Sequence, residues 1–334
     1  VLIDQDQENA EKGKDYSVKL LDKALSRKKT TEEKKEKLLS LITPTTDYGL
    51  LKGADLIVEA VFENRDIKAE VTAKAEEQIT ENAVFGSNTS TLPISGLAQN
   101  SSRPDNFIGI HYFSPVEKMP LVEIIMGEKT SQETLAKTMD YVQKIKKTPI
   151  VVNDSRGFYT SRVFGTYTGE GVAMLAEGIK PALIENAGKM TGMPMAPLAL
   201  ADAVALDLAW KVTTQTKKDF EAEGKDFPIT PMYSIMEEMV DKQGRFGKKN
   251  NKGFYEYPEN GKKYLWPELS NLCKESDDQP DVEELKKRFL YIQAVETAKC
   301  FEENVLTDVR DADIGAILGW GMAPWTGGPL SFID

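Results

Sequence analysis

Short apolar runs alternate with helical patterns along the first part of the chain, and this alternation constrains the fold more than any other feature. Apolar runs, most of them rich in β-branched residues, lie at 1–4, 55–62, 83–87, 107–113, 121–125 and 149–152. Helical patterns separate them at 7–26, 31–42, 66–79 and 131–146. Strands that alternate with helices predict an α/β domain with a largely parallel sheet. From 158 to 240 the strand signal fades, and the sequence predicts helices interrupted by Gly and Pro.

The end of the chain repeats part of this helical region. A shift of 126 residues aligns three charged pairs: Arg162 with Arg288, Glu170 with Glu296 and Glu177 with Glu303. A shift of 127 aligns three more pairs: Gly192 with Gly319, Met195 with Met322 and Pro197 with Pro324. A one-residue insertion in a loop explains the slip between the two sets. The order and register of the matches predict a duplicated helical unit.

The 334 residues are enough for two or more domains, and they divide where the pattern changes. We predict an α/β domain at 1–155, a helical domain at 156–258, a linker at 259–280 and a second helical domain at 281–334. The family resemblance described below implies that the first is a Rossmann-like dinucleotide-binding domain and that the second serves substrate binding or dimerisation. The chain begins at Val1 inside a predicted strand and stops at Asp334 without a closing element. We therefore expect a fragment, incomplete at the start of the first domain and at the end of the last.

Charge and composition exclude several classes of function. The net charge of −11 argues against a nucleic-acid surface and offers no polybasic patch for a membrane. The two cysteines, Cys273 and Cys300, form neither a disulfide framework nor a metal-ligand pattern, so we expect no metal site. The longest apolar stretch, at 193–210, is interrupted by Asp202 and Asp207, so we expect no membrane span.

The stretch 106–127 contains the strongest candidate for a chemical site. Its first apolar run carries His111, the only histidine in the chain, and its second carries Glu123 between two apolar neighbours. A carboxylate in such a position is costly unless it has a partner, and a strand pair folded back on itself can bring the two side chains together. The carboxylate would then hold one imidazole nitrogen and leave the other to exchange a proton near neutral pH. A satisfied core histidine is the alternative that the pair alone leaves open.

Polar residues also follow several of the predicted strands, at the edge where open α/β sheets bind ligands. Asp4 ends the first run, at the position where an acid accepts hydrogen bonds from an adenosine ribose. The sequence has no Arg beside it that could bind a 2′-phosphate. This pattern favours NAD over NADP. Four more residues follow later strands: Glu63, Lys68, Asn88 and Ser90. The G-x-G-x-x-G loop of such domains is missing from this sequence, and we expect it, with its strand, upstream of Val1.

Six segments resemble the L-3-hydroxyacyl-CoA dehydrogenase family, in its order and spacing and over nearly the whole chain. They are DQ at 4–5, VEAVFEN at 58–64, SNTST at 87–91, HYFSPVEKMPLVEII at 111–125, GFYTSR at 157–162 and KGFYEY at 252–257. The later stretch DADIGAILGWGMAPWTGGPL, at 311–330, resembles the fused multifunctional enzymes of fatty-acid oxidation. In those proteins an enoyl-CoA hydratase domain precedes the dehydrogenase, and none of that part is present in this sequence.

The resemblance implies oxidation of (3S)-3-hydroxyacyl-CoA to 3-oxoacyl-CoA with NAD in fatty-acid β-oxidation. The implied partners are the acyl-CoA substrate, a thiolase subunit and a second copy of the chain. We expect a bacterial cytoplasmic protein, with mitochondria and peroxisomes left open. Two alternatives remain: a short-chain 3-hydroxybutyryl-CoA dehydrogenase, and a non-catalytic scaffold or truncated fragment without its glycine loop.

The resemblance also assigns a role to each candidate residue. The catalytic set has His111 as general base, Glu123 as its orienting partner, Ser90 on the reacting oxygen and Ser161. The cofactor set is Asp4, Gln5, Ala60, Glu63, Lys68, Asn88 and Ser114. The CoA set is Ser17, Ser90 and Lys28, the last within a basic cluster at 27–29. Ser114 and Ser161 stand where the family commonly has Asn; serine is shorter but still donates a hydrogen bond, so a bridging water can restore a contact.

Overall fold

The computed structural model of the chain describes residues 1–222 and 224–334. They form two compact units: Val1–Ile110 with Met126–Asp140, and His111–Ile125 with Tyr141–Asp334. Three elements contribute residues to both units: β5 (Phe107–Tyr112), β6 (Leu121–Met126) and α5 (Gln132–Lys144).

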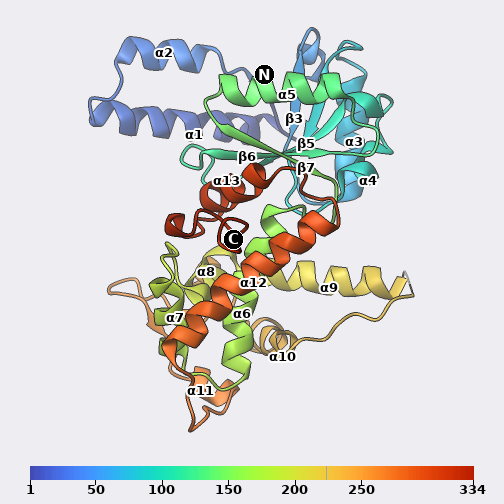
Figure 1. Cartoon of the computed structure of the whole chain (residues 1–334). Helices are drawn as coiled ribbons and strands as arrows, with labels where there is room; N and C mark the ends of the chain where they lie inside the picture. The colour runs from blue at the N-terminus through green and yellow to red at the C-terminus, as the bar shows by residue number, and fades with distance from the viewer. Residues whose placement is uncertain (223) are drawn as a thin grey trace. The chain divides into compact units, whose positions relative to one another are not determined.

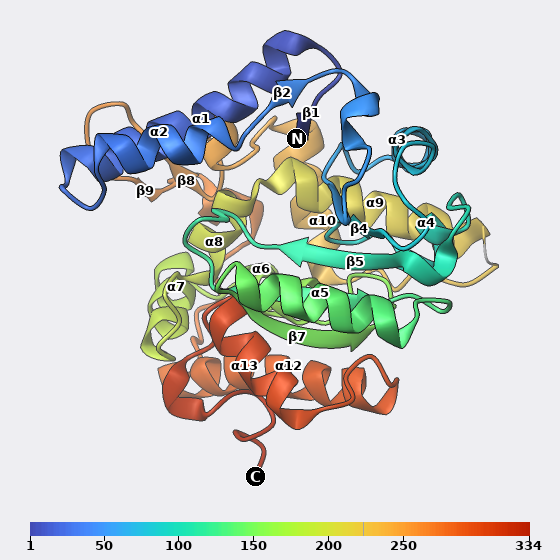
Figure 2. The ribbon, with the colours of Figure 1, turned by 90° about the horizontal axis from the view of Figure 1, so that it is seen from above.

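The first unit begins with a small parallel pair of strands and a helical hairpin. The elements are β1 (Leu2–Ile3), α1 (Gln7–Ser26), α2 (Glu32–Ser40) and β2 (Pro44–Thr45). Asp6 caps α1 by accepting a hydrogen bond from Asn9 N at 2.8 Å, and Thr31 caps α2 in the same way through Lys34 N. The two helices lie side by side (Figure 1 and Figure 2). β2 is absent from the sequence prediction, because two residues become a strand only by pairing with β1.

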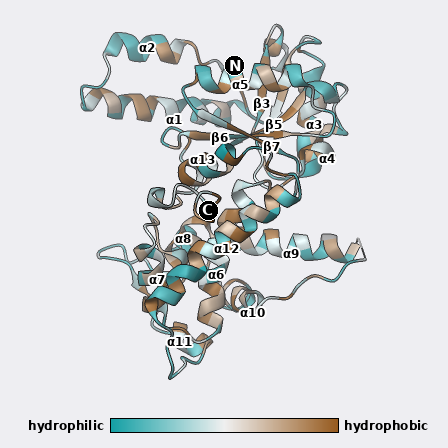
Figure 3. Cartoon of the chain, viewed as in Figure 1, coloured by the Kyte–Doolittle hydropathy of each residue, from teal (hydrophilic) through white to brown (hydrophobic). Residues whose placement is uncertain are grey.

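The rest of the first unit is built on a parallel sheet. Its strands run in the order β3 (Leu56–Glu59), β4 (Val84–Ser87) and β5, and both pairings are parallel. The helical elements beside them are η1 (Tyr48–Leu51), α3 (Arg65–Glu76), α4 (Ile94–Ala98) and η2 (Pro104–Asn106). Figure 3 shows β5 as hydrophobic, and all but the last of its residues are buried, as expected for a strand inside a sheet. The predicted parallel sheet is confirmed, with strand ends trimmed by one to three residues.

The second unit contains the end of β5, then β6 and β7 (Thr148–Asn153), which follow one another in the sheet. The helix α13 (Val309–Gly319) packs against β7. Gly315 of α13 is closely covered, because a Cβ there would lie 2.8 Å from Ile150 Cδ1 and 3.1 Å from the Tyr159 ring. The last helical block therefore packs directly on this sheet.

The remainder of the second unit is helical, as the sequence predicts. Its helices are α6 (Thr160–Ala176), α7 (Pro181–Met190), α8 (Pro197–Val204), α9 (Leu206–Ala222), α10 (Pro231–Glu237), η3 (Glu238–Lys242), η4 (Lys248–Asn250), α11 (Leu269–Leu272), α12 (Val282–Glu302), α13 and η5 (Pro324–Thr326). The helix α6 lies at the centre, in contact with α7, α8, α10, α12 and α13. The long helices α6 and α12 lie side by side (Figure 1).

The segment 259–280 is packed, whereas its polar composition predicts a linker. It contains β9 (Tyr264–Leu265), which pairs antiparallel with β8 (Tyr255–Glu256), and the short helix α11. Trp266 is 8% exposed, and the Arg245 guanidinium lies 3.8 Å from the centre of its ring. Leu269 is buried as well. Two apolar side chains therefore anchor a segment whose other residues are mostly polar, while the domain boundaries given above stay predictions.

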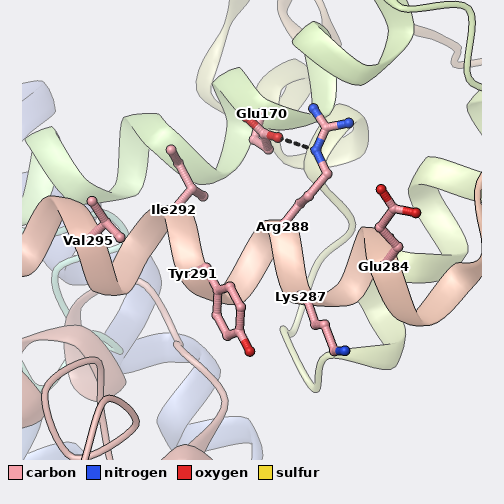
Figure 4. Close-up of a pocket in the computed structure, with 7 residues that line it drawn as sticks. All are labelled: Glu170, Glu284, Lys287, Arg288, Tyr291, Ile292 and Val295. Atoms are coloured by element: carbon pink, nitrogen blue, oxygen red, sulfur yellow. Dashed lines mark hydrogen bonds and ion pairs between the residues drawn. The ribbon is translucent and has the colours of Figure 1, made fainter.

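The charged residues that repeat along the sequence bind one another across α6 and α12. Arg162 of α6 pairs with Glu296 of α12 and with Glu303, the residue that follows this helix. Arg288 of α12 pairs in return with Glu170 of α6 at 2.7 Å and, at 2.6 Å, with Glu177, the residue that follows α6. Figure 4 shows the bond between Arg288 and Glu170. Two copies of one unit related by a two-fold axis make such reciprocal contacts, so the geometry supports the proposed duplication.

Candidate active site

The structure brings His111 and Glu123 into direct contact. His111 lies near the end of β5 and Glu123 in the middle of β6. His111 Nδ1 lies 2.8 Å from Glu123 Oε2. Both side chains are removed from water, since Glu123 is 0% exposed and His111 4% exposed. With Nδ1 held by the carboxylate, Nε2 is the ring nitrogen left for proton transfer.

Glu123 is also bound to the start of α6. Its Oε1 accepts hydrogen bonds from Tyr159 N and Thr160 N, each at 3.0 Å. Its Oε2 accepts the Thr160 hydroxyl at 2.6 Å. No side chain of α6 caps this helix, so the carboxylate satisfies N–H groups that the first turn leaves without partners. These donors fix the orientation of the carboxylate toward His111.

A second buried cluster, in the first unit, is centred on Glu59 and Lys68. Lys68 Nζ lies 2.8 Å from Glu59 Oε1 and 3.1 Å from Oε2, and the two residues are 1% and 3% exposed. Ser87 Oγ donates to Glu59 at 2.7 Å, and so does Val61 N. Lys68 Nζ also donates to the carbonyl of Asn88 at 3.2 Å. The ammonium group is thus bound within the protein and fixes the loop that follows β4.

Glu63 organises the same loop from its other side. Its Oε1 accepts hydrogen bonds from Thr89 Oγ1, at 2.5 Å, and from Ser90 N, at 3.0 Å. Its Oε2 lies 3.7 Å from Lys68 Nζ. The structure therefore gathers Glu63, Lys68, Asn88 and Ser90 at the ends of β3 and β4, where the sequence places them on one sheet edge.

The other predicted site residues lie singly on the surface of their units. Four are exposed and lie in or beside loops: Asp4, Gln5, Ala60 and Ser114. Ser17 is half-buried in α1, and Lys28 is exposed just beyond the end of that helix. Ser161 is half-buried in the first turn of α6. Within the described part of the chain, neither Ser114 nor Ser161 hydrogen-bonds to His111 or Glu123.

Glu59 and Thr160 are among the side chains of these clusters that are missing from the sequence prediction. Glu59 lies between Val58 and Ala60 in an apolar run, which is the signal that identified Glu123, so it could have been found. Thr160 gives no such signal, because its contact depends on the approach of α6 to β6. The GFYTSR motif indicates its neighbour Ser161 instead.

Two further buried carboxylates connect the KGFYEY segment to the helices around it. Asp202 of α8 accepts hydrogen bonds from Phe254 N, at 2.8 Å, from Tyr255 N and from the Tyr257 hydroxyl. Burial raises the pKa of Asp202 to about 6, although these donors oppose the rise. Burial also raises the pKa of Glu185 of α7, which accepts the Tyr255 hydroxyl and Leu198 N. Every oxygen of this cluster has a structural partner, which indicates a structural role.

Other kinds of site have little support in the described residues. Over 1–222 and 224–334, His, Cys, Asp and Glu side chains nowhere gather in threes in a way that could hold a metal ion. None of the helices described has the length and apolar character that crossing a membrane requires. A hollow of about 350 Å³ lies beside α12, lined by Tyr291, Ile292 and Val295 next to the Arg288–Glu170 pair (Figure 4). None of the predicted site residues lines it.

Comparisons with known families match most of the chain. Residues 1–155 match the NAD binding domain of 3-hydroxyacyl-CoA dehydrogenase, and residues 157–257 match the C-terminal domain of the same family. The fatty acid oxidation complex subunit alpha of Shewanella amazonensis is 40% identical over 322 residues, or 96% of this chain. The corresponding protein of Shewanella loihica is 39% identical over 323 residues. The chain spans only 45% and 44% of the lengths of these two relatives.

Solved structures agree with these matches. A (S)-3-hydroxybutyryl-CoA dehydrogenase from Ralstonia eutropha superposes with a TM-score of 0.70 at 34% identity, covering 77% of this chain and 89% of its own. The dehydrogenase part of a multifunctional enzyme from C. elegans covers 96% of this chain and 72% of its own, with a TM-score of 0.64 and 28% identity. A 3-hydroxybutyryl-CoA dehydrogenase from Escherichia coli covers 99% of this chain and 84% of its own, with a TM-score of 0.81. At 22% identity, that last likeness establishes the fold alone.

Proposed function

Because the chain belongs to the 3-hydroxyacyl-CoA dehydrogenase family, whose members are NAD-dependent oxidoreductases, we propose that His111 and Glu123 carry the oxidation of a (3S)-3-hydroxyacyl-CoA to the 3-oxoacyl-CoA. The observation that carries this proposal is the buried 2.8 Å contact between the only histidine and a carboxylate with three further donors. A histidine that merely filled the core would not need such a carboxylate.

The chemistry assigned to these two residues is proton transfer. His111 accepts the 3-hydroxyl proton at Nε2, and Glu123 stabilises the imidazolium that forms. Bound NAD supplies the acceptor for the C3 hydride. Glu123 also keeps the remaining ring proton on Nδ1, so the imidazole presents an unprotonated Nε2 to the substrate.

The residues proposed to hold NAD suit that cofactor. Asp4 is exposed just after β1, and Gln5 follows it, so both side chains are open to the hydroxyls of an adenosine ribose. Glu63 and Asn88 would hold the nicotinamide side of the cofactor, and Lys68 would act indirectly by fixing the Asn88 carbonyl. Ala60 and Ser114 complete the proposed set.

The residues proposed to hold the substrate are serines and one lysine. Ser90 would bind the reacting oxygen, and Ser161 would support it from the first turn of α6. Ser17 and Lys28 would bind the CoA portion, with the lysine paired to a phosphate.

The whole protein is proposed to be a fused enzyme of fatty-acid β-oxidation. Relatives named as alpha subunits of the fatty acid oxidation complex are about twice as long as this chain. We infer an enoyl-CoA hydratase domain elsewhere in the same polypeptide, a thiolase subunit as partner and a bacterial cytoplasmic location. A homo-oligomer remains part of the proposal as well.

A short-chain substrate is the second candidate, favoured by the Ralstonia eutropha structure named as a 3-hydroxybutyryl-CoA dehydrogenase. A profile of kcat/KM against acyl length, from four to sixteen carbons, separates the two candidates. A maximum at four carbons with a steep decline would favour the short-chain enzyme. A flat or rising profile would favour the general one.

The proposed function is tested by His111→Gln in the complete protein, with NAD reduction followed by absorbance. Turnover should fall by about two to four decades, since positioned proton transfer contributes that much, while NAD affinity stays within about twofold. Lys74→Gln on α3 is the control, because Lys74 is exposed and pairs with the neighbouring exposed Glu70. Near-normal turnover by His111→Gln would end the assignment. A complete protein that bound no NAD would favour the non-catalytic alternative.

A further inference from the structure

The Thr160 hydroxyl lies in the candidate active site without a part in the proton transfer described above. Its Oγ1 donates to Glu123 Oε2 at 2.6 Å. This carboxylate oxygen, Glu123 Oε2, also lies 2.8 Å from His111 Nδ1. Thr160 is 1% exposed, so water does not replace this hydroxyl in the native protein. The hydroxyl and the imidazole therefore share one carboxylate oxygen in a dry environment.

We propose that Thr160 is a positioning residue that sets the pH range in which His111 accepts a proton, an inference that rests on the proposed function. A hydrogen bond donated to a carboxylate stabilises its negative charge. Charge stabilised by Thr160 is less available to stabilise the protonated imidazole on the same oxygen. The hydroxyl therefore lowers the pH at which His111 loses its proton, and so extends its use as a base toward acidic pH.

Other groups facing the pair do not take over this task. Burial raises the pKa of the Tyr159 phenol well above its ordinary value, and burial raises the pKa of the Cys300 thiol of α12 to about 12. Both groups therefore stay neutral around pH 7. Asp313 of α13 accepts the Ser331 hydroxyl at 2.6 Å and Leu330 N at 2.9 Å. Backbone N–H groups bind Oε1 at every pH, so Thr160 is the side-chain donor that acts on the oxygen facing His111.

The single histidine makes a direct measurement practical. Ring resonances of His111 are followed by NMR between about pH 4 and 9 in the 334-residue chain, prepared without a histidine tag. We expect Thr160→Val to raise the titration midpoint by about 0.5 to 1 pH unit, because the carboxylate no longer accepts the hydroxyl hydrogen bond and stabilises the protonated imidazole more strongly. Thr160→Ser restores a hydroxyl and should return the midpoint to within about 0.2 units of the wild type.

Thr166→Val is the matched control, because Thr166 lies on the same helix and donates to Val163 O at 2.7 Å instead of to Glu123. Its midpoint should equal that of the wild type. If Thr160→Val does not fold, Thr160→Ala against Thr160→Ser gives the same comparison. An unchanged or lowered midpoint in the variant without a hydroxyl overturns the proposal.

The readout needs neither substrate nor cofactor, so it separates two kinds of failure. An unchanged midpoint together with an active complete protein would remove the role of Thr160 and leave the dehydrogenase standing. A raised midpoint in a protein whose activity survives His111→Gln would support the interaction and overturn the proposed function. In an active protein, the acid limb of kcat/KM should move in Thr160→Val by the same amount as the NMR midpoint.

Discussion

Two buried carboxylates, Glu59 and Glu123, organise the two polar clusters of this chain, and they do so with different partners. Each lies on a strand between apolar neighbours, and neither is more than 3% exposed. Glu59 binds the ammonium of Lys68 and the hydroxyl of Ser87. Glu123 binds an imidazole, a hydroxyl and two backbone N–H groups.

The difference between the partners separates a structural pair from a chemical one. The Glu59–Lys68 pair joins two buried side chains, and Lys68 also donates to the Asn88 carbonyl, so this pair fixes the loop after β4. Histidine is the side chain that ordinarily exchanges a proton near neutral pH, so the Glu123–His111 pair has a partner suited to proton transfer, and α6 holds its geometry. Burial alone therefore does not distinguish a catalytic carboxylate. The ability of its partner to give and take a proton does.

The largest expected effect is on turnover in Glu123→Gln. In the complete protein we expect kcat to fall by about two to four decades, because the amide no longer stabilises the imidazolium. Steady-state NAD reduction at saturating substrate measures this loss. Glu128→Gln is the control, since Glu128 is exposed just beyond β6. A Glu59→Gln protein that lost as much kcat as Glu123→Gln would break the distinction between the two pairs.

The next effect is on stability in Glu59→Gln. Removal of one partner leaves the Lys68 ammonium buried with less compensation, which costs about 3–5 kcal/mol in the free energy of unfolding. Urea unfolding of the chain measures this difference. Glu70→Gln on α3 is the matched control, because its pair with Lys74 is exposed and should leave the unfolding curve unchanged.

A double variant sharpens the same point. Glu59→Gln with Lys68→Met removes both charges, so most of the stability lost by Glu59→Gln should return. A double variant as unstable as the single one would mean that Glu59 acts through Ser87 and the strand, and not through the ion pair.

Most elements of the fold could be predicted because local patterns determine them. The helix α1 occupies Gln7–Ser26 as expected, since an Asp cap and an apolar stripe define it. The strand β2 could not be predicted, because its two residues owe their conformation to pairing with β1. The packed segment around Trp266 was also hidden, because one or two buried side chains anchor a stretch whose average composition is polar.

The candidate site could be predicted in part, for a similar reason. A carboxylate in an apolar strand needs a partner, so Glu123 and the only histidine could be matched from the sequence. The same argument applied to Glu59 predicts that this carboxylate needs a partner, and the structure shows that the partner is Lys68. The contact of Thr160 could not be predicted, because it arises where α6 approaches β6 and no local pattern encodes that approach.

Asp202 gives a third kind of buried carboxylate, one that makes stability depend on pH. Burial raises its pKa to about 6, whereas the group titrates near 3.8 in an unfolded chain. Between these pH values the folded protein holds a proton that the unfolded chain has released, so stability is greatest below about pH 4 and declines as the pH rises toward 6. We expect this group to contribute a decline of roughly 2–3 kcal/mol between pH 4 and 7. Urea unfolding at both pH values measures it in wild type and Asp202→Asn.

The control for this measurement is Asp140→Asn, an exposed carboxylate at which the pH dependence should match that of the wild type. Asp202→Asn should be less stable overall, since the amide places a donor against Phe254 N or Tyr255 N. Its stability should nevertheless vary less with pH. Equal pH dependence in wild type and Asp202→Asn would show that the carboxyl is protonated alike in the folded and unfolded chains.

The smallest expected effect concerns the reciprocal ion pairs of α6 and α12. Here the structure predicts that the loss of either arginine lowers the stability by the same amount. Arg162 and Arg288 are each partly exposed, at 20% and 29% of the side chain, and each pairs with one glutamate in the other helix and one just beyond its end. Arg162→Gln and Arg288→Gln should each cost about 1 kcal/mol in the free energy of unfolding, since partly screened ion pairs contribute little more. If the two helices are copies of one unit, the two losses should agree within about 0.5 kcal/mol.

Only the Arg162 variant should also alter kcat, because Arg162 lies two residues beyond the Thr160 that binds Glu123. The contacts of Glu123 connect the candidate active site to α6 and not to α12. An equal effect of both variants on kcat would contradict this and would mean that both helices support the active site.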